Sequence, residues 1–337
     1  MSQRQHYTGC LALALLLACL PTPDAHALRV MDFAGRNVEL ARPAERIVAL
    51  APHIVENVFT AGAGHKLVGV VSYSDFPETA QRIPVVGSYN AFSFEEIVAL
   101  DPDLVLMWGS GNGMQTLTRL ERLGIPVYVS ELRQLADVPE SIRKLGQLAG
   151  TQAISDAQAA RIQAQLGTLR NRYGGRQPLD VFYQIWNEPL QTVNGEHLIS
   201  EVIALCGGRN IFGNSPALAP RVSIESVLLA NPDAIVASGM GLARPEWLDD
   251  WRRYPALKAV RNNGLFFVDP DLIQRPTARV LSGAHALCEQ LNGLRGDPKD
   301  GQVAPDNARV PGLASGPDFA KLSPRRTAPT VHTRNSA

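Results

Sequence analysis

Two glutamates occupy equivalent places in a pattern that occurs twice in this chain. Residues 93–111 read SFEEIVALDPDLVLMWGSG and residues 223–241 read SIESVLLANPDAIVASGMG. A repeat so widely spaced does not fit a solenoid, whose units run roughly 20–50 residues. It predicts two similar lobes, each with a helix, a PD turn, a buried strand and one carboxylate. Without a gap, the copies share Ser93/Ser223, Glu95/Glu225, Pro102/Pro232, Asp103/Asp233, Gly109/Gly239 and Gly111/Gly241.

The two glutamates have two interpretations. Glu95 and Glu225 each follow a serine by two positions, and an acidic residue in the first turn of a helix is stabilised by the helix dipole. Alternatively, two exposed carboxylates at symmetric places could orient the molecule on a symmetric partner that carries a basic patch on each half. The residues alone leave both interpretations open.

Other residues that could form a metal, phosphate-binding or catalytic site lack the partner residues that such sites need. His53 and Glu56 share one helix face, but a metal site takes three or four ligands, and the other histidines are scattered without motif spacing. The glycine-rich residues 109–113 lack the Lys-Ser/Thr of a phosphate loop and the G-x-G-x-x-G spacing. The G-x-S-x-G nucleophile motif is also missing from the sequence. We therefore expect no catalytic residues and no metal site.

The N-terminus reads as a secretory signal. The apolar run from Leu11 to Leu20 is too short to span a bilayer, and Ala25-His26-Ala27 is an A-x-A cleavage signal. We expect residues 1–27 to be removed and the mature chain to begin near Leu28. The alternative is a lipoprotein that is lipid-anchored at Cys19.

Export decides how the cysteines are interpreted. Cys10 and Cys19 lie in the signal region, so the mature chain keeps Cys206 and Cys288. Two cysteines in an oxidising compartment are expected to pair, and on the chain-entropy model so large a loop gives roughly 4–5 kcal/mol. The alternative is two buried free thiols.

The composition is that of a globular protein, with 45% hydrophobic and 19% charged residues and a formal net charge of zero. Nucleic-acid binding needs a concentrated basic face, which this charge balance does not favour. The length that remains after the signal allows two domains.

The elements that must position these residues alternate between strands and helices. Residues 29–40 alternate apolar and polar around Ala34-Gly35-Arg36, which predicts a hairpin. Strand, helix and strand in this order indicate an α/β fold with a mostly parallel sheet. Strands are expected at ERIVALAP, KLVGVVSY, PDLVLMW and IPVYVS, with helices at residues 53–62, around Glu95 and over TLTRLERLG.

A long helical region at residues 137–173, broken near Gly150-Thr151, separates the two copies of the repeat. Its second part, from Gln152 to Tyr173, has no proline and is rich in alanine and glutamine, which favours helix. We therefore expect residues 151–175 to be a rigid connecting helix.

The connecting helix divides the expected fold into an N-terminal α/β lobe at residues 28–150 and a C-terminal α/β lobe at residues 176–296. The second lobe is expected to contain strands at DVFYQIW and GLFFVDP and helices at HLISEVIALCGG and from about Thr277 to Leu294. Residues 297–337 are rich in Pro, Gly, Ser and Arg with few large apolar residues, which predicts a disordered tail.

These stretches together resemble the periplasmic substrate-binding proteins of ABC importers, in the class with two Rossmann-like lobes joined by one long helix. Within this class the chain is most similar to cobalamin receptors. The resemblance implies a monomeric periplasmic receptor without enzymatic activity that delivers a corrinoid to an ABC permease dimer. It runs from about Arg29 to Leu294 and is carried by PAERIVALAP, LVGVVSYSDFPETAQRIPVVG, FEEIVALDPDLVLMW, VIALCGGRNIF and VSIESVLLANPDAIV.

The resemblance also implies a ligand site in a cleft between the lobes. A corrin ring is flat, and aromatic side chains cover such a face at low entropic cost. Tyr89 stands where the relatives have a tryptophan, and Ala219 replaces another family tryptophan. Matched position by position, the ligand-binding residues are Tyr73, Tyr89, Trp108 and Trp186, with Asp271 and Arg275 at the cleft edge.

Each assignment from the resemblance has an alternative. Glu95 and Glu225 match the lobe glutamates that dock on arginine pockets of the permease, which favours docking over a capping role alone. Tyr73 and Trp108 could instead pack in the core, although Trp108 ends a strand where a crevice is expected in open α/β sheets.

The ligand has alternatives as well. A ferric siderophore usually requires several Arg or Lys in the cleft, and a haem receptor of the same class would use His53 or a cleft tyrosine. A periplasmic enzyme on a similar scaffold is the most distant alternative. In every case, a continuous connecting helix implies only a small closing motion.

Overall fold

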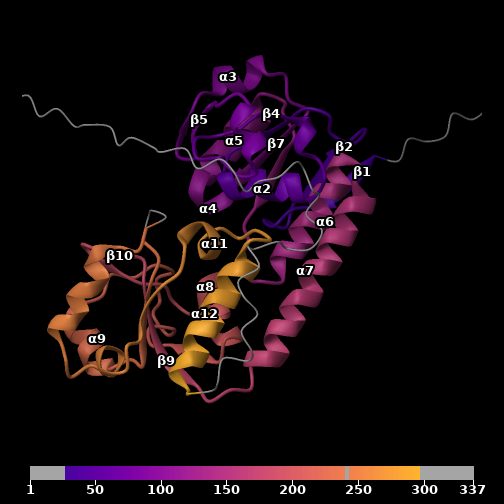
Figure 1. Cartoon of the computed structure of the whole chain (residues 1–337). Helices are drawn as coiled ribbons and strands as arrows, with labels where there is room; N and C mark the ends of the chain where they lie inside the picture. Colours follow the sequence, from indigo (N-terminus) through magenta and orange to yellow (C-terminus); the bar gives the residue numbers. More distant parts are fainter. Residues whose placement is uncertain (1–26, 240–242, 297–337) are drawn as a thin grey trace, which may run out of the picture. The chain divides into compact units, whose positions relative to one another are not determined.

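The computed structural model describes residues 27–239 and 243–296. Cys19, nearly all of the predicted signal and the predicted tail at 297–337 lie outside the described residues. Among the helices of the described residues, none combines the length and apolar character that a transmembrane span requires. The fold is two α/β lobes, each with a four-stranded parallel sheet (Figure 1).

The first sheet has the strand order β4-β3-β7-β8, and all three pairings are parallel. Its central strand β7 is buried along LVLM because helices cover both faces of a parallel sheet. The expected hairpin at 29–40 is confirmed as β1 paired with β2. The strands are β1 Leu28–Met31, β2 Asn37–Leu40, β3 Ile47–Ala49, β4 Leu67–Gly69, β7 Leu104–Trp108 and β8 Val127–Ser130.

Short elements follow the strands of the first sheet. Pro52 occupies the first turn of α2, where its missing N–H costs nothing, and Ser93 caps α3. A further hairpin, β5 Gly87–Ser88 with β6 Ala91–Phe92, was not expected. The helices are α2 Pro52–Thr60, η2 Gly64–Lys66, η3 Glu78–Arg82, α3 Phe94–Ala99, α4 Gly109–Asn112 and α5 Met114–Arg122.

The long helical region consists of α6, Asp137–Ala149, and α7, Gln152–Tyr173, which lie side by side (Figure 1). Gly150 ends α6 with a φ of 69°, a left-handed conformation that glycine adopts without steric cost. The break predicted at Gly150-Thr151 is therefore confirmed. The 22-residue helix α7 contacts α6, α8 and α12, so it packs against elements of both lobes.

The second sheet has the strand order β12-β9-β13-β14, again parallel throughout. A small antiparallel hairpin, β10–β11, follows β9 directly. The strands are β9 Leu179–Gln184, β10 Trp186–Asn187, β11 Leu190–Gln191, β12 Gly208–Asn210, β13 Ala234–Ala237 and β14 Leu265–Phe267. The helices are α8 Leu198–Leu205, α9 Ile224–Ala230, η4 Glu246–Arg253, α10 Lys258–Arg261, α11 Pro270–Ile273 and α12 Val280–Leu294.

Cys206 and Cys288 form the predicted disulfide, which joins the end of α8 to α12. Both cysteines are fully buried, and the bond between their sulfur atoms contradicts the alternative of two free thiols. The bridge closes a separation of 82 residues and ties together two helices on the second sheet.

The predicted strand KLVGVVSY is shorter in the structure than in the sequence analysis. β4 ends at Gly69, and its pairing with β3 is irregular, since Ile47 pairs with Leu67 whereas Val48 pairs with Gly69. Val70 then forms an isolated bridge with Val85 instead of continuing the sheet. The chain leaves the sheet at this point, which frees the residues up to Tyr73 to form a loop at the carboxyl edge.

Candidate functional site

Aromatic side chains gather at the carboxyl edge of the first sheet. Trp108 is the last residue of β7, and His53 lies in the first turn of α2, which follows β3. The rings of His53 and Trp108 meet edge to face with centroids 5.3 Å apart. The ring of Tyr89, on the turn between β5 and β6, lies 6.0 Å from that of Trp108. The structure thus brings Tyr89 and Trp108 together, as a shared site requires.

Tyr73 lies at the same carboxyl edge of the first sheet because the preceding residue, Ser72, is hydrogen-bonded to β5. The backbone N–H and the hydroxyl of Ser72 both donate to the carbonyl of Gly87, at 2.8 and 3.1 Å, so the Tyr73 loop is fastened to the β5 strand. Tyr73 has a φ of 66°, which is sterically unfavourable for a residue with a side chain, and its ring is 77% exposed. A strained and exposed tyrosine is what a binding surface needs and what core packing does not explain.

His53 is neutral in the folded protein. Burial, and next the positive charge of Arg275, lower the pKa of His53 to about 3. Its ring is 7% exposed and is covered by Trp108. Among the described residues, no group of three or more His, Cys, Asp or Glu side chains is arranged to hold a metal ion.

A buried carboxylate joins the two lobes. Glu56 of α2 has a side chain only 3% exposed and accepts hydrogen bonds from two arginines of the C-terminal lobe. Its Oε1 lies 2.8 Å from Arg275 Nη1 and 3.0 Å from Arg279 Nη2, and its Oε2 lies 3.0 Å from Arg279 Nε. Geometry of this quality offsets the desolvation of the charges.

Asp271 and Arg275 take part in the same cluster. Arg275 Nη2 lies 3.0 Å from Asp271 Oδ1, and Arg275 Nη1 lies 3.3 Å from Asp75 Oδ1. The Arg275 side chain is 17% exposed and its guanidinium is held by three carboxylates. Both residues lie at the contact between the lobes, and their place at a cleft edge and their contact with a ligand stay predictions.

Sequence reasoning missed several members of this contact between the lobes. Arg279 also lies over the ring of Phe76, with its Cζ 4.3 Å from the ring centroid. Asn57 donates to the carbonyl of Pro276 at 3.0 Å. One signal was available: Glu56 interrupts the apolar helix PHIVENVF, and a buried acid predicts a cationic partner.

Trp186 makes different contacts from the other aromatic residues of the predicted site. It begins the β10–β11 hairpin at the carboxyl end of β9, and its Nε1 donates to the carbonyl of Glu188 at 2.9 Å. Within the described residues, ring contacts join Tyr89 and His53 to Trp108 but do not include Trp186. Its place at a strand end agrees with a ligand contact from the second lobe, which stays a prediction.

Glu95 and Glu225 lie in matching surroundings. Ser93 caps α3 and Ser223 caps α9 by accepting the backbone N–H of Glu96 and Ser226, respectively. Both glutamates are exposed. The backbone N–H of Glu225 and then the Ser223 hydroxyl hold the pKa of the Glu225 carboxyl below its ordinary value.

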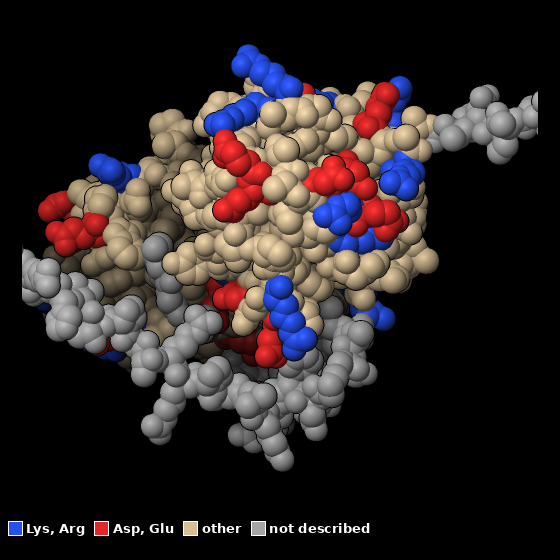
Figure 2. Space-filling view, turned by 90° about the horizontal axis from the view of Figure 1, so that it is seen from above, with Lys and Arg blue, Asp and Glu red and all other residues tan. Residues whose placement is uncertain are grey.

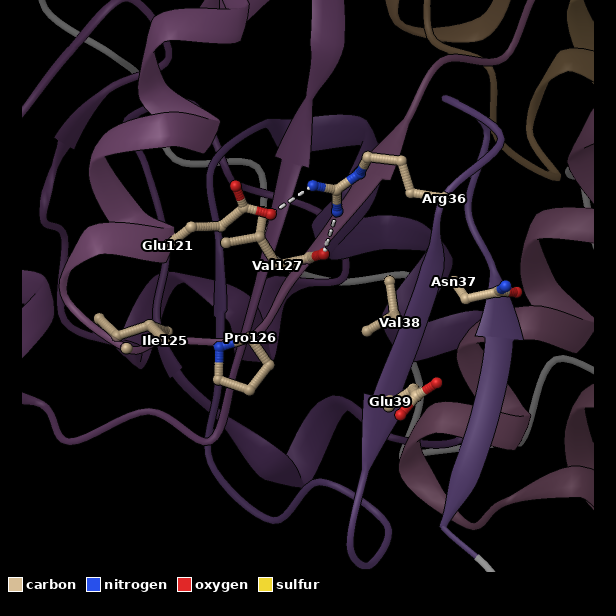
Figure 3. Close-up of a pocket in the computed structure, with 9 residues that line it drawn as sticks. Arg36, Asn37, Val38, Glu39, Glu121, Ile125, Pro126 and Val127 are labelled. Atoms are coloured by element: carbon tan, nitrogen blue, oxygen red, sulfur yellow. Dashed lines mark hydrogen bonds and ion pairs between the residues drawn. The ribbon is translucent and has the colours of Figure 1, made fainter.

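A pocket of about 420 Å³ lies elsewhere on the N-terminal lobe, between β2 and the turn from α5 to β8 (Figure 3). Its arginine, Arg36, donates to Glu121 at 2.6 Å and to the Val127 carbonyl at 2.8 Å. Arg36 also pairs with the buried Asp32. This arginine therefore joins the first hairpin to the sheet, and none of the predicted site residues lines the pocket.

Figure 2 shows separate groups of acidic and basic side chains on one face of the molecule, with wide areas of other residues between them. No large area of positive charge is visible on that face, which agrees with the expectation from the neutral net charge.

Sequence comparisons identify relatives along most of the chain. A family model described as periplasmic binding protein matches residues 47–272. A vitamin B12-binding protein of Vibrio campbellii is 36% identical over 253 residues, which cover 75% of this chain and 91% of the relative. A vitamin B12-binding protein of Yersinia pestis is 36% identical over 278 residues, which cover 82% of this chain and 96% of the relative.

Solved structures agree in fold. The periplasmic vitamin B12 binding protein BtuF of Vibrio cholerae superposes with a TM-score of 0.70 at 35% identity, covering 76% of this chain and 99% of that chain. The periplasmic heme-binding protein RhuT from Roseiflexus superposes with a TM-score of 0.66 at 23% identity, covering 74% and 99%. At that identity the second likeness shows the fold alone.

The neutral state of His53 predicts how stability depends on pH. An unfolded histidine binds a proton near pH 6.5, whereas folded His53 does so only near pH 3, so stability is lost as the pH falls between these values. We expect His53 to account for about 2 kcal/mol of the loss between pH 7 and pH 5. His197, with a pKa lowered to about 4 by burial and then by Arg133, adds to the loss.

Urea unfolding at pH 7 and pH 5 measures this effect. His53→Gln should reduce the loss of unfolding free energy by about 2 kcal/mol, and His65→Gln, at an exposed histidine, is the matched control. The same pH dependence in His53→Gln and wild type would contradict a neutral buried imidazole.

Proposed function

Because the chain belongs to the family of periplasmic binding proteins, we propose that it binds cobalamin or a related corrinoid and delivers it to an ABC import permease. The observation that carries the proposal is the aromatic group Tyr73, Tyr89 and Trp108 at the carboxyl edge of the first sheet. It occurs in a chain 36% identical to proteins named for vitamin B12 binding.

The charges near this group support a corrinoid over a ferric siderophore. Arg275 and Arg279 belong to the charge cluster around Glu56, where they face the carboxylates of Glu56, Asp75 and Asp271. Three carboxylates against two guanidinium groups leave no excess positive charge for an anionic chelate. A flat, amide-rich ligand needs aromatic faces and hydrogen-bond partners instead.

Haem ligation through His53 does not suit the same geometry. A haem receptor that used His53 as an axial ligand would have to expose the imidazole, which Trp108 covers in this structure. Tyr73, which is 77% exposed, is the more accessible side chain.

Docking to the permease is the second part of the proposal. Glu95 and Glu225 are exposed and occupy equivalent turns of α3 and α9, one in each lobe. Apolar side chains on the same helices are exposed as well: Val98 at 47% and Leu229 at 89%. A carboxylate flanked by apolar surface suits a specific protein contact better than a purely solvated face.

The remaining features complete the proposed receptor. It is a monomer without catalytic activity, exported to the periplasm by the signal at residues 1–27, with lipid attachment at Cys19 as the alternative. The rigid α7 and the ion pairs of Glu56 allow only a small closing motion of the lobes.

Titration of the purified domain at residues 28–296 with cyanocobalamin tests the ligand. We expect one-to-one binding with heat exchange for cyanocobalamin and none for haem or a ferric siderophore measured in parallel. Binding of haem or the siderophore in place of cyanocobalamin would keep the receptor function and replace the ligand. Turnover of any of these ligands would contradict the absence of catalysis.

The aromatic site predicts the effect of removing Trp108. Trp108→Ala should weaken cyanocobalamin binding by at least about 1–2 kcal/mol, a rise in Kd of roughly 5- to 30-fold, because a buried aromatic contact is lost. Tyr254→Ala, which removes a half-buried aromatic residue of another hydrophobic cluster, is the control. An unchanged Kd in Trp108→Ala would remove this residue from the site.

The docking interpretation predicts a separation of binding from uptake. Glu95→Ala with Glu225→Ala should leave the Kd for cyanocobalamin unchanged and abolish uptake of labelled cobalamin by cells that depend on this receptor. Glu96→Ala with Glu246→Ala, at two other exposed glutamates, should support normal uptake. Wild-type uptake by the Glu95/Glu225 variant would refute docking.

A further inference from the structure

The buried carboxamide of Asn112 is hydrogen-bonded to the backbone of both Trp108 and Tyr89, the two aromatic residues whose rings are in contact. Asn112, the last residue of α4, is 6% exposed. Its Oδ1 accepts the backbone N–H of Trp108 at 2.6 Å. Its Nδ2 donates to the carbonyls of Leu50 at 3.0 Å and Tyr89 at 2.5 Å. One side chain therefore joins the end of β7, the segment after β3 and the turn of the β5–β6 hairpin.

Only an amide of this length satisfies all three backbone groups. It supplies an acceptor for one N–H and two donor hydrogens for two carbonyls, whereas a carboxylate supplies acceptors only. Loss of the amide would leave these buried groups without their partner, which is costly in a dry environment.

The hairpin that carries Tyr89 depends on contacts of this kind. β5 and β6 have two residues each, and a hairpin so short is not stable by itself. Ser72 holds its first strand through Gly87, and Asn112 holds its turn at Tyr89. The position of the Tyr89 ring is therefore set from outside the hairpin.

The residues before Asn112 fix the other ring. Glu131 accepts the backbone N–H of Ser110 at 2.8 Å and its hydroxyl at 3.0 Å, which fastens α4 to the end of β8. A Cβ on Gly111 would lie 1.9 Å from Cε3 of Trp108, so the indole ring needs a glycine at this position. In the segment GSGN, Ser110 bonds to Glu131, Gly111 leaves room for the Trp108 ring, and Asn112 bonds to the Trp108 backbone.

We propose that Asn112 is a positioning residue that presets the separation and tilt of Tyr89 and Trp108 before a ligand arrives. Preset rings need not be ordered on binding, and less ordering cost gives higher affinity. The inference rests on the proposed function for its effect on affinity, but the arrangement of the rings can be measured without a ligand.

The first experiment uses no ligand. Near-UV circular dichroism of Asn112→Ala should differ from that of the wild type because the environment of Trp108 changes. In a Trp108→Phe background, the Asn112→Ala substitution should leave the tryptophan bands nearly unchanged, and only the tyrosine bands should still change, because Asn112 also holds Tyr89. If the tryptophan bands change by the same amount without Trp108, Asn112 does not act on that ring and the proposal is overturned.

The second experiment measures affinity against a matched asparagine. Asn194 of the C-terminal lobe is also buried, donates to the Ser215 carbonyl and accepts the Glu196 N–H, both at 3.0 Å. Asn112→Ala should raise the Kd for cyanocobalamin about tenfold, and Asn194→Ala less than about twofold. An equal rise in both variants would show a purely structural role and overturn the proposal.

A second variant separates a folding defect from a positioning role. Asn112→Asp, which retains the acceptor for Trp108 but loses both donors, replaces Asn112→Ala if urea unfolding shows that the alanine variant does not fold. It should change the spectrum through the lost bond to Tyr89, whose ring contacts Trp108, and it should raise the Kd. If wild-type protein does not bind cyanocobalamin at all, the proposed function fails, and the circular dichroism comparison still decides the role of Asn112.

Discussion

The buried carboxylate of Glu56 is the centre of the charge cluster that joins the two lobes. It lies on an otherwise apolar helix of the N-terminal lobe and is held by Arg275 and Arg279, which lie more than 200 residues later in the sequence. An unpaired carboxylate at 3% exposure would be strongly unfavourable, by about 3–5 kcal/mol for a broken buried pair. A motion that separated these groups would therefore be rarely populated. The lobes can move about this contact but are not expected to part from it.

The same cluster limits the free charge that the adjacent surface can offer to the proposed ligand. Its arginines are neutralised by carboxylates, so they stabilise the lobe contact rather than offer free charge. Burial next to Arg275 also keeps His53 neutral, with a pKa lowered to about 3. What remains accessible at the carboxyl edge of the first sheet is mainly aromatic: Tyr73 and Tyr89 are 77% and 44% exposed. Such a surface selects for flat area more than for charge.

Most strands and long helices could be predicted from the sequence because their patterns are local. β7 and β8 are continuous apolar runs, as parallel strands covered on both faces must be, and α6 and α7 are separated by a glycine. The hairpins that carry Tyr89 and Trp186 escaped prediction because two residues per strand show no periodicity. The helical turn α4 was also missed, since GSGN has poor helix propensity and is held by tertiary hydrogen bonds to Glu131 and Tyr89. The partners of Glu56 leave no local pattern at all.

The repeat places the proposed ligand and docking residues on connected segments in both lobes. In the first lobe, the β5–β6 hairpin that carries Tyr89 leads directly into Ser93, the cap of the helix with Glu95, and Ser93 N–H donates to Val86 at 2.9 Å. In the second lobe, the hairpin that begins at Trp186 accepts the Val222 N–H at its Leu190 carbonyl, at 3.0 Å, one residue before the cap of the helix with Glu225. A ligand that displaced either hairpin would have to move the neighbouring helix start or strain these bonds. A shift of either hairpin would therefore act first on the start of the helix that carries the proposed docking glutamate.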